Sequence, residues 1–189
     1  MEELVQVDFK KETSPLNKFL PLSLSAVLLA LDQITKFLVV KYIEPYSVGA
    51  SFLGDFFRII HVANKGIAFS FGSGFQNGLR SILFGVLPLV VLILVLIVYF
   101  RSKDFTSFQR WTICGIIGGG LGNLFDRFFR PNGVVDFIDI KFYGIFGFER
   151  WPTFNVADMS VLICGILLMI SFIIAIIKES VEKKEDHDK

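Results

Sequence analysis

The stretch FNVADMSVLICGILLMISFIIAIIK, which runs from Phe154 to Lys178, decides the fold. Positions 159–177 carry no charge, and this is about the length that a helix rising 1.5 Å per residue needs to cross a bilayer. Asn155 and Asp158 stand immediately before this run. Ionisable groups at the edge of hydrocarbon usually have partners or face a cavity, so this polar pair requires an explanation.

The composition of the whole chain is typical of a membrane protein. Of its 189 residues, 53% are hydrophobic and 22 are phenylalanine, and the mean hydropathy is +0.61. The net charge of +1, without a clustered basic face, argues against nucleic acid as a partner. Cys114 and Cys164 lie in apolar runs with no histidine nearby, which favours packing or lipid-facing roles over a metal site or a disulfide.

Four segments have the length and composition of membrane-spanning helices and predict an all-α membrane protein with four transmembrane helices: 19–40, 81–100, 111–129 and 159–177. The second and fourth segments are uncharged throughout. The first and third admit charge only late, with Asp32 and Lys36 in one and Asp126 and Arg127 in the other. We expect one four-span domain over 19–178.

The basic residues predict how these spans are oriented. The connection 101–110 carries three basic residues, whereas the much longer connection 41–80 carries only four. Lys and Arg concentrate in cytoplasmic loops, so 101–110 is predicted to be cytoplasmic. The N-terminal extension 1–18 and the charged tail 179–189, expected to be solvated and frayed, then lie on the same side. The connections 41–80 and 130–153 are predicted to be external.

This topology brings distant carboxylates to one depth. The first and third spans run outward and the fourth runs inward, so their polar ends all lie toward the external face. The connection NGVVDFIDI adds a further aspartate just after the third span. The acids that are expected to converge are Asp32, Asp126, Asp136 and Asp158. One such residue could be incidental, but four predict a site.

Each of these polar residues also has a structural interpretation. Asn155 is a good N-cap, and an acid three residues later favours the positive end of a helix. Asp32 and Lys36 stand four apart on one helical face, where an ion pair is ordinary. Asp126 and Arg127 could form a local pair that anchors their span at the interface. These interpretations stay open beside the functional one.

Three further stretches have less specific readings. The run GIIGGGLGN has small-xxx-small spacing, which favours close helix packing, at Gly115 with Gly119 and at Gly118 with Gly122. Asn64, in HVANKGIAFSFGSG, either makes a turn or presents an amide to a ligand. Asp139 continues the alternation of VVDFIDIKF, which predicts a strand with one wet side, so we expect it at the surface.

Paired carboxylates in a partly dry site suit acid–base chemistry. Two such groups cannot both ionise easily, so one keeps a proton near neutral pH while the other takes a proton from water, as in aspartic peptidases. The sequence has no HExxH, GxSxG or GxGD motif. The alternative is a small proton-coupled transporter or channel, which would need acids through the full membrane depth, whereas the inner halves of these spans are nearly uncharged.

Five motifs together resemble lipoprotein signal peptidase, also called signal peptidase II, a family of aspartic intramembrane peptidases. They are LDQITKFLV, NKGIAFSF, GGGLGNLFDRFF, GVVDFI and FNVAD, and they lie in the family's order between Leu31 and Met159. Ile67 and Gly120 stand where the family often has alanine, a departure that bears on substrate preference more than on activity.

The resemblance implies specific roles for the polar residues. It assigns the catalytic pair to Asp136 and Asp158, and it implies neither a metal nor a cofactor. Residues that it implies bind substrate or support the site are Asn64, Gly66, Asn123, Asp126, Arg127, Asn155, Asp32 and Lys36.

The resemblance also implies a substrate and a setting. The enzyme would cut a diacylglyceryl-modified bacterial prolipoprotein just before its lipidated cysteine, by activating water between the two aspartates. It would act among the lipids of the bacterial cytoplasmic (inner) membrane, with its active site toward the periplasmic face. The small size and four spans of the chain are compatible with a monomer. A small β-cradle and lid, built from 41–80 and 130–153, would cover the pocket.

Overall fold

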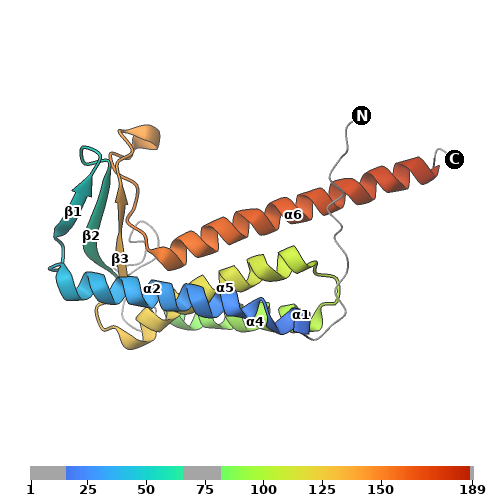
Figure 1. The fold of residues 1–189 in the computed structure, drawn as a ribbon, viewed down its shortest axis with the longest axis horizontal. Coiled ribbons are helices and arrows are strands. Elements are labelled where there is room, and N and C mark those ends of the chain that lie inside the picture. The colour runs from blue at the N-terminus through green and yellow to red at the C-terminus, as the bar shows by residue number, and fades with distance from the viewer. Residues whose placement is uncertain (1–15, 66–81, 188–189) are drawn as a thin grey trace.

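The computed structural model describes residues 16–65 and 82–187, which form helices interrupted by a small sheet. The helices are α1 (Leu16–Phe19), α2 (Leu22–Tyr42), the π-helical turn η2 (Ile82–Val86), α4 (Leu87–Arg101), α5 (Ser107–Phe129) and α6 (Val156–His187). The strands are β1 (Val48–Phe52), β2 (Phe57–Asn64) and β3 (Val134–Ile140), and a 3-10 turn, η3 (Ile145–Gly147), follows them. Figure 1 shows the sheet at one end of the helices. Gly66 and most of the 1–18 extension lie outside the described residues.

Three stretches of the described chain are long and apolar enough to cross a membrane: Leu22–Tyr42, Ile82–Arg101 and Val156–Lys184. They match the first, second and fourth predicted spans, whose helical nature and length are confirmed. Helix α5 covers the third predicted span and has 23 residues, but it is more polar. Because α5 packs against α2, α4 and α6, its side chains mostly meet other helices. The four-span arrangement stays a prediction.

The glycine run lets α5 approach two helices at once, which confirms its predicted packing role. A Cβ on Gly118 would lie 2.9 Å from the backbone of Ser25 in α2, whereas a Cβ on Gly119 would collide with the carbonyl oxygen of Ala157 in α6. Serine hydroxyls bridge the same interfaces. Ser25 Oγ donates to the Cys114 carbonyl at 2.5 Å, and Ser160 Oγ donates to the Gly115 carbonyl at 2.7 Å. These contacts fix α5 between α2 and α6.

Gly119→Ala is expected to lower the free energy of unfolding by about 1–3 kcal/mol, because the added methyl group overpacks a backbone contact. The matched control is Gly120→Ala, whose Cβ would meet only Leu92 Cδ1, at 3.4 Å. Unfolding in detergent micelles, followed by helical circular dichroism, measures both variants. Equal stability of the two variants would show that the Gly119 contact can relax without cost.

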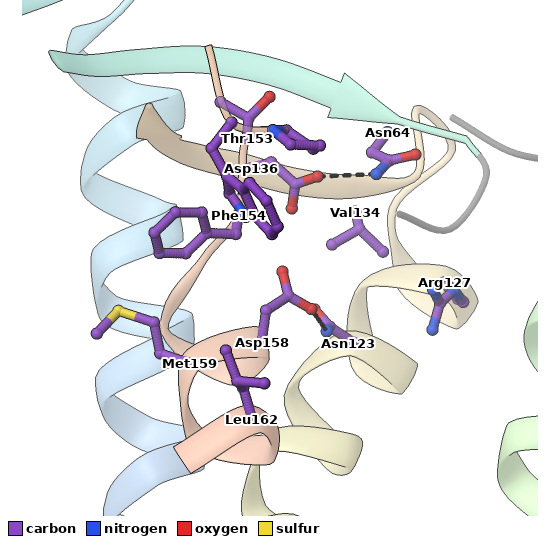
Figure 2. Close-up of a pocket in the computed structure, with 12 residues that line it drawn as sticks. Asn64, Asn123, Arg127, Val134, Asp136, Thr153, Phe154, Asp158, Met159 and Leu162 are labelled. Carbon is purple, nitrogen blue, oxygen red and sulfur yellow. Dashed lines mark hydrogen bonds between the residues drawn. The ribbon is translucent and has the colours of Figure 1, made fainter. Parts of the chain in front are cut away.

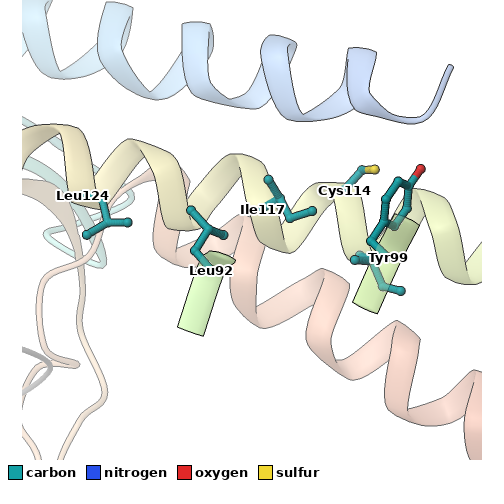
Figure 3. Close-up of a cluster of buried hydrophobic side chains, with 6 residues drawn as sticks. Leu92, Tyr99, Cys114, Ile117 and Leu124 are labelled. Atoms are coloured by element: carbon teal, nitrogen blue, oxygen red, sulfur yellow. The ribbon is translucent and has the colours of Figure 1, made fainter. Parts of the chain in front are cut away.

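Helices α4 and α5 share an apolar core. Figure 3 shows the buried side chains between them, which are Leu92, Tyr99, Ile113, Cys114, Ile117 and Leu124. Arg110 closes one end of this core, since its guanidinium donates to the carbonyl groups of Tyr99 and Ser102 at 3.2 and 3.0 Å. The last turn of α4 is thereby capped by a side chain of α5.

The three strands form an antiparallel sheet in the order β1-β2-β3. Strands β1 and β2 form a hairpin in which Phe52 lies opposite Phe57, whereas β3 comes from much later in the chain. In the β2–β3 pair, Val62 lies opposite Asp136 and Asn64 lies opposite Val134. The small sheet expected from the two long connections is confirmed for the residues that the structure describes, and its role as an external cradle and lid stays a prediction.

Asp139 is buried, which contradicts its predicted surface position. Its side chain accepts hydrogen bonds from Arg58 Nε at 2.6 Å and from Arg150 Nε at 2.8 Å. Arg150 also bonds Asp55 in the turn between β1 and β2. The alternation of the strand sequence indicated one wet face, but two arginines from distant parts of the chain cover that face. The result is an ionic link across the sheet between a buried aspartate and two partly exposed arginines.

The charged tail is helical rather than frayed in the part that the structure describes. Helix α6 continues to His187, about ten residues beyond the uncharged run. The tail is rich in Glu and Lys, which favour helix, and Lys183 pairs with Glu179 at 2.7 Å in the stabilising i,i+4 arrangement.

Candidate active site

The two predicted catalytic aspartates face each other because the chain returns to β3 just before α6 begins. The amides of Phe137 and Ile138 donate to the Phe154 carbonyl oxygen at 3.0 and 2.8 Å, and the Phe154 amide donates to Ile138 O at 3.1 Å. Asp136 lies on β3 beside this pairing, and Asp158 lies in the first turn of α6. Figure 2 shows both carboxyl groups pointing into one pocket.

Asp136 is held by two amide side chains. Asn64 Nδ2 donates to Asp136 Oδ2 at 2.8 Å, and Asn155 Nδ2 donates to Oδ1 at 2.7 Å. The pKa of Asp136 is nevertheless raised from 3.8 to about 7. Burial is the largest cause, because it disfavours the charged form, and the negative charge of Asp158 acts in the same direction. The two asparagine hydrogen bonds act against this rise.

Asp158 forms a reciprocal cap with Asn155 at the start of α6. The Asp158 amide donates to Asn155 Oδ1 at 2.9 Å, while the Asn155 amide donates to Asp158 Oδ2 at 3.2 Å. This confirms the predicted capping role. The other oxygen, Oδ1, accepts a hydrogen bond from Asn123 Nδ2 at 2.7 Å. Capping and placement in the pocket are therefore compatible roles of the same carboxylate.

A buried lysine underlies the asparagines. Lys36 Nζ lies 2.8 Å from Asp32 Oδ2 and 3.0 Å from Asp126 Oδ2, and all three side chains are fully buried. The same ammonium donates to Asn123 Oδ1 at 3.0 Å, which leaves the Nδ2 group of Asn123 directed at Asp158. A local i,i+4 pair on α2 is therefore part of a cluster that reaches the pocket.

Both aspartates of this cluster also hold backbone groups of the site. The Ala157 amide, in the first turn of α6, donates to Asp32 Oδ1 at 3.0 Å. The Val135 amide, next to Asp136, donates to Asp126 Oδ2 at 3.1 Å. Among the described residues Asp126 forms ion pairs with Lys36 and Arg130, so the alternative of a local pair with Arg127 is not supported. Helices α2 and α5 thus fix the backbone on both sides of the carboxylate pair.

Two members of this cluster were not predicted from the sequence. Arg130 Nε donates to Asp126 Oδ1 at 2.9 Å, and Gln33 Nε2 donates to both Asp32 and Asp126, at 3.1 and 3.2 Å. The spacing of four between Asp126 and Arg130 was a usable signal. No comparable signal exists for Gln33, because its partners come from two helices.

The pocket has a volume of about 310 Å³. Its walls are formed by Asn64, Asn123, Arg127, Val134, Asp136, Trp151, Pro152, Thr153, Phe154, Asp158, Met159 and Leu162. Five predicted site residues thus line one cavity, and Asn155, Asp32, Lys36 and Asp126 lie behind it. The sequence did not predict the part of the wall formed by residues 151–154. It also did not predict the apolar lining residues Met159 and Leu162. Gly66 lies outside the described residues.

Fold and site together define a helical membrane protein with a facing pair of carboxylates in a pocket where its helices meet its sheet. The chain belongs to the signal peptidase II family, because the family model described as Signal peptidase (SPase) II matches residues 24–174.

Named relatives and solved structures agree with this assignment. The lipoprotein signal peptidase of Treponema pallidum is 53% identical over 156 residues, covering 82% of this chain and 84% of the relative. That of Treponema denticola is 50% identical over 161 residues, covering 85% and 92%. A solved bacterial membrane enzyme superposes with a TM-score of 0.69 at 28% identity, covering 88% of this chain and 93% of the other.

Proposed function

We propose that this protein is a membrane endopeptidase that removes signal peptides from prolipoproteins, as the name of its relatives indicates for them. The observation that carries an aspartic mechanism is the pair of Asp136 and Asp158, which face one pocket from different surroundings. Asp136 is buried between amides and has a pKa of about 7. Asp158 accepts hydrogen bonds from a helix N-terminus and from Asn123.

In the proposed reaction, Asp158 takes a proton from a water molecule, and the oxygen of that water attacks the scissile carbonyl carbon. Asp136 donates its proton to the carbonyl oxygen, which gives a neutral tetrahedral diol. Asp158 then passes its proton to the leaving nitrogen as the C–N bond breaks. Asp136 recovers a proton from the diol as the new carboxyl product forms. The charges of the pair are restored without a covalent intermediate.

Two further residues are proposed to hold the peptide. Arg127 lies in the pocket wall and is attracted by the carboxylates of Asp158 and Asp136, so its guanidinium is placed to donate to substrate carbonyl groups. Asn64 lies in the same pocket wall and donates to Asp136, and it is proposed to hold the extended peptide beside that carboxyl group. The connections 41–80 and 130–153 would exclude water from the bound peptide.

We further propose that α5 spans the membrane together with the three apolar helices, with both termini cytoplasmic and the pocket toward the external face of the bacterial inner membrane. The buried ion pair between Lys36 of α2 and Asp126 of α5 supports this, because it places α5 beside α2 inside the helix bundle. Reporter fusions after Phe100 and after Arg130 should show opposite sides. Placement of the 101–110 connection outside would contradict the orientation.

A monomer is proposed as the working unit, and sedimentation in detergent tests it.

The purified protein should cleave a diacylglyceryl-modified prolipoprotein and leave the same precursor without its lipid uncut. Mass spectrometry of the products locates the cut before the modified cysteine. A proton-coupled transporter is not favoured by the family membership, and it would instead carry proton flux in liposomes. Flux without cleavage would overturn the proposed function.

The raised pKa of Asp136 predicts a pH dependence. Because Asp136 must hold a proton in the proposed reaction, kcat/KM falls about tenfold per pH unit above about pH 7. The hydrogen bond from Asn64 lowers this pKa, so Asn64→Ala should move the alkaline limb to higher pH. Rates are measured in buffers of constant ionic strength. An alkaline limb that stays in place in Asn64→Ala would assign the titration to another group.

A further inference from the structure

The turn that joins α5 to β3 lies against the residue that donates to Asp136 from β2. It has the sequence RPNG, from Arg130 to Gly133, and the Gly133 amide donates to the Arg130 carbonyl oxygen at 3.2 Å. Proline second and glycine fourth are typical of a β-turn. Gly133 has a φ of +92°, a conformation that favours glycine. Beside it lies Asn64, the last residue of β2.

Gly133 touches the main chain of Asn64 so closely that no side chain fits between them. A Cβ on Gly133 would collide with the Asn64 carbonyl oxygen and would lie 2.9 Å from its carbonyl carbon. A Cβ contact this short requires one of the two segments to move. The next residue, Val134, lies opposite Asn64 in the β2–β3 pair, so the two segments are also joined by the sheet.

Asp126 fixes the turn on both sides of Gly133. Arg130 Nε donates to Asp126 Oδ1 at 2.9 Å, and the Val135 amide donates to Oδ2 at 3.1 Å. The Arg130 amide also donates to the Asp126 carbonyl oxygen at 2.8 Å. Asp126 is itself fully buried and lies 3.0 Å from Lys36 Nζ. Because a buried charged group holds the turn at both ends, the turn resists displacement.

The end of β2 is held on one side of the sheet. Strand β1 pairs with β2 between Phe57 and Ile60, whereas β3 pairs with it as far as Asn64. Within the part of the chain that the structure describes, the strand that pairs with Asn64 is therefore β3 alone. Added bulk at Gly133 is expected to displace Asn64 rather than the turn.

We infer that Gly133 is a positioning residue for the cleavage reaction, because its lack of a side chain lets Asn64 reach Asp136. The inference rests on the proposed function, since the hydrogen bond between Asn64 and Asp136 affects cleavage only if Asp136 takes part in it. Asn64 Nδ2 lies 2.8 Å from Asp136 Oδ2. Among the described residues, those that line the pocket include Asn64 and Asp136 but not Gly133. Gly133 therefore acts on the site through Asn64.

The test compares Gly133→Ala with a matched control, Gly144→Ala. Gly144 also has a positive φ, +82°, but a Cβ there would meet nothing within 4 Å. Both variants share the backbone strain, and they differ in the contact. Gly133→Ala should lower kcat/KM for a lipidated precursor about 10–100-fold, because a shift of about 1 Å at a positioning group can cost about 10²-fold. Gly144→Ala should stay near the parent.

The pH profile separates positioning from a general loss of structure. The hydrogen bond from Asn64 lowers the pKa of Asp136, so weakening it in Gly133→Ala should move the alkaline limb of kcat/KM to higher pH. Asn64→Ala should move the limb in the same direction. The other charged groups that interact with Asp136 are unchanged in Gly133→Ala: Lys36 of α2, Arg127 of α5 and Asp158 of α6.

A double variant tests whether Gly133 acts through Asn64. Gly133→Ala added to Asn64→Ala should cause little further loss of kcat/KM, because the hydrogen bond that it disturbs is already absent. Losses that multiply in the double variant would overturn the inference. An alkaline limb that stays in place in Gly133→Ala would overturn it as well.

Gly133→Asn keeps the test decisive if Gly133→Ala does not fold. Asparagine brings a Cβ to the same place but tolerates a positive φ better than alanine, so it keeps the contact with less backbone strain. Its control is Gly144→Asn, and its alkaline limb should also move to higher pH. If Gly133→Asn does not fold either, the contact is required for folding itself and the positioning role is overturned.

The outcomes separate the two proposals. If the parent does not cleave a lipidated precursor, the proposed function fails and the role of Gly133 in it fails too. If the parent cleaves the precursor and Gly133→Ala matches both the parent and Gly144→Ala, only the positioning role is overturned.

Discussion

Asp136→Asn and Asp158→Asn are each expected to reduce cleavage of a lipidated precursor by about 10²–10⁴-fold, the usual contribution of a positioned acid or base. In the proposed reaction, each change removes one of the two groups that exchange protons with water and substrate. Asparagine keeps nearly the same shape, but its amide nitrogen replaces one accepting oxygen, so each variant keeps only one of the two accepting oxygens of the parent carboxylate. Single-turnover cleavage measures the chemical step directly.

The control for a general charge effect is Asp104→Asn, an exposed aspartate in the connection between α4 and α5. It should keep parental activity. Thermal unfolding in detergent shows whether the two site variants remain folded. A folded Asp136→Asn or Asp158→Asn protein with near-parental turnover would exclude that aspartate from the chemistry.

Lys36→Met is expected to lower the free energy of unfolding by about 3–5 kcal/mol, the usual effect of removing one partner from a buried ion pair. The substitution leaves Asp32 and Asp126, both fully buried, without the ammonium that lies within 3.0 Å of each. Cleavage should fall as well, because Lys36 also holds the amide that donates to Asp158. Chemical unfolding in micelles gives the stability change.

Lys41→Met is the matched control, since Lys41 is an exposed lysine on the same helix. It should change stability by less than about 0.5 kcal/mol. The double variant Lys36→Met with Asp32→Asn removes one of the two stranded charges, so it should be more stable than Lys36→Met alone. Additive losses in the double variant would contradict a coupled cluster.

The sequence was most informative where topology and local chemistry agreed. Alternating spans predicted that Asp158 and Asp136 reach one depth, and the structure adds the reason, which is the main-chain pairing of Phe154 with β3. The capping role of Asn155 followed from residue type and spacing alone, and it is confirmed. These features depend on backbone geometry and neighbours along the chain, which a single sequence displays.

Pairings between distant segments were not predictable in the same way. Lys36 was assigned to Asp32 on its own helix, and its second partner on α5 was missed. Asp139 was placed at the surface because the strand pattern cannot show that Arg58 and Arg150 fold over it. Such contacts depend on how elements meet in space, and the sequence pattern is silent about that.

Because Phe154 pairs with Ile138, the relative position of Asp136 and Asp158 does not depend on the length of the chain between them. The two carboxylates are aligned by peptide groups, and the turn around Ile145 lies beyond that alignment. An insertion or deletion at this turn is therefore expected to leave Asp158 in place opposite Asp136. The turn is accordingly the place where a tag or a new recognition loop can be grafted while the reaction centre is preserved.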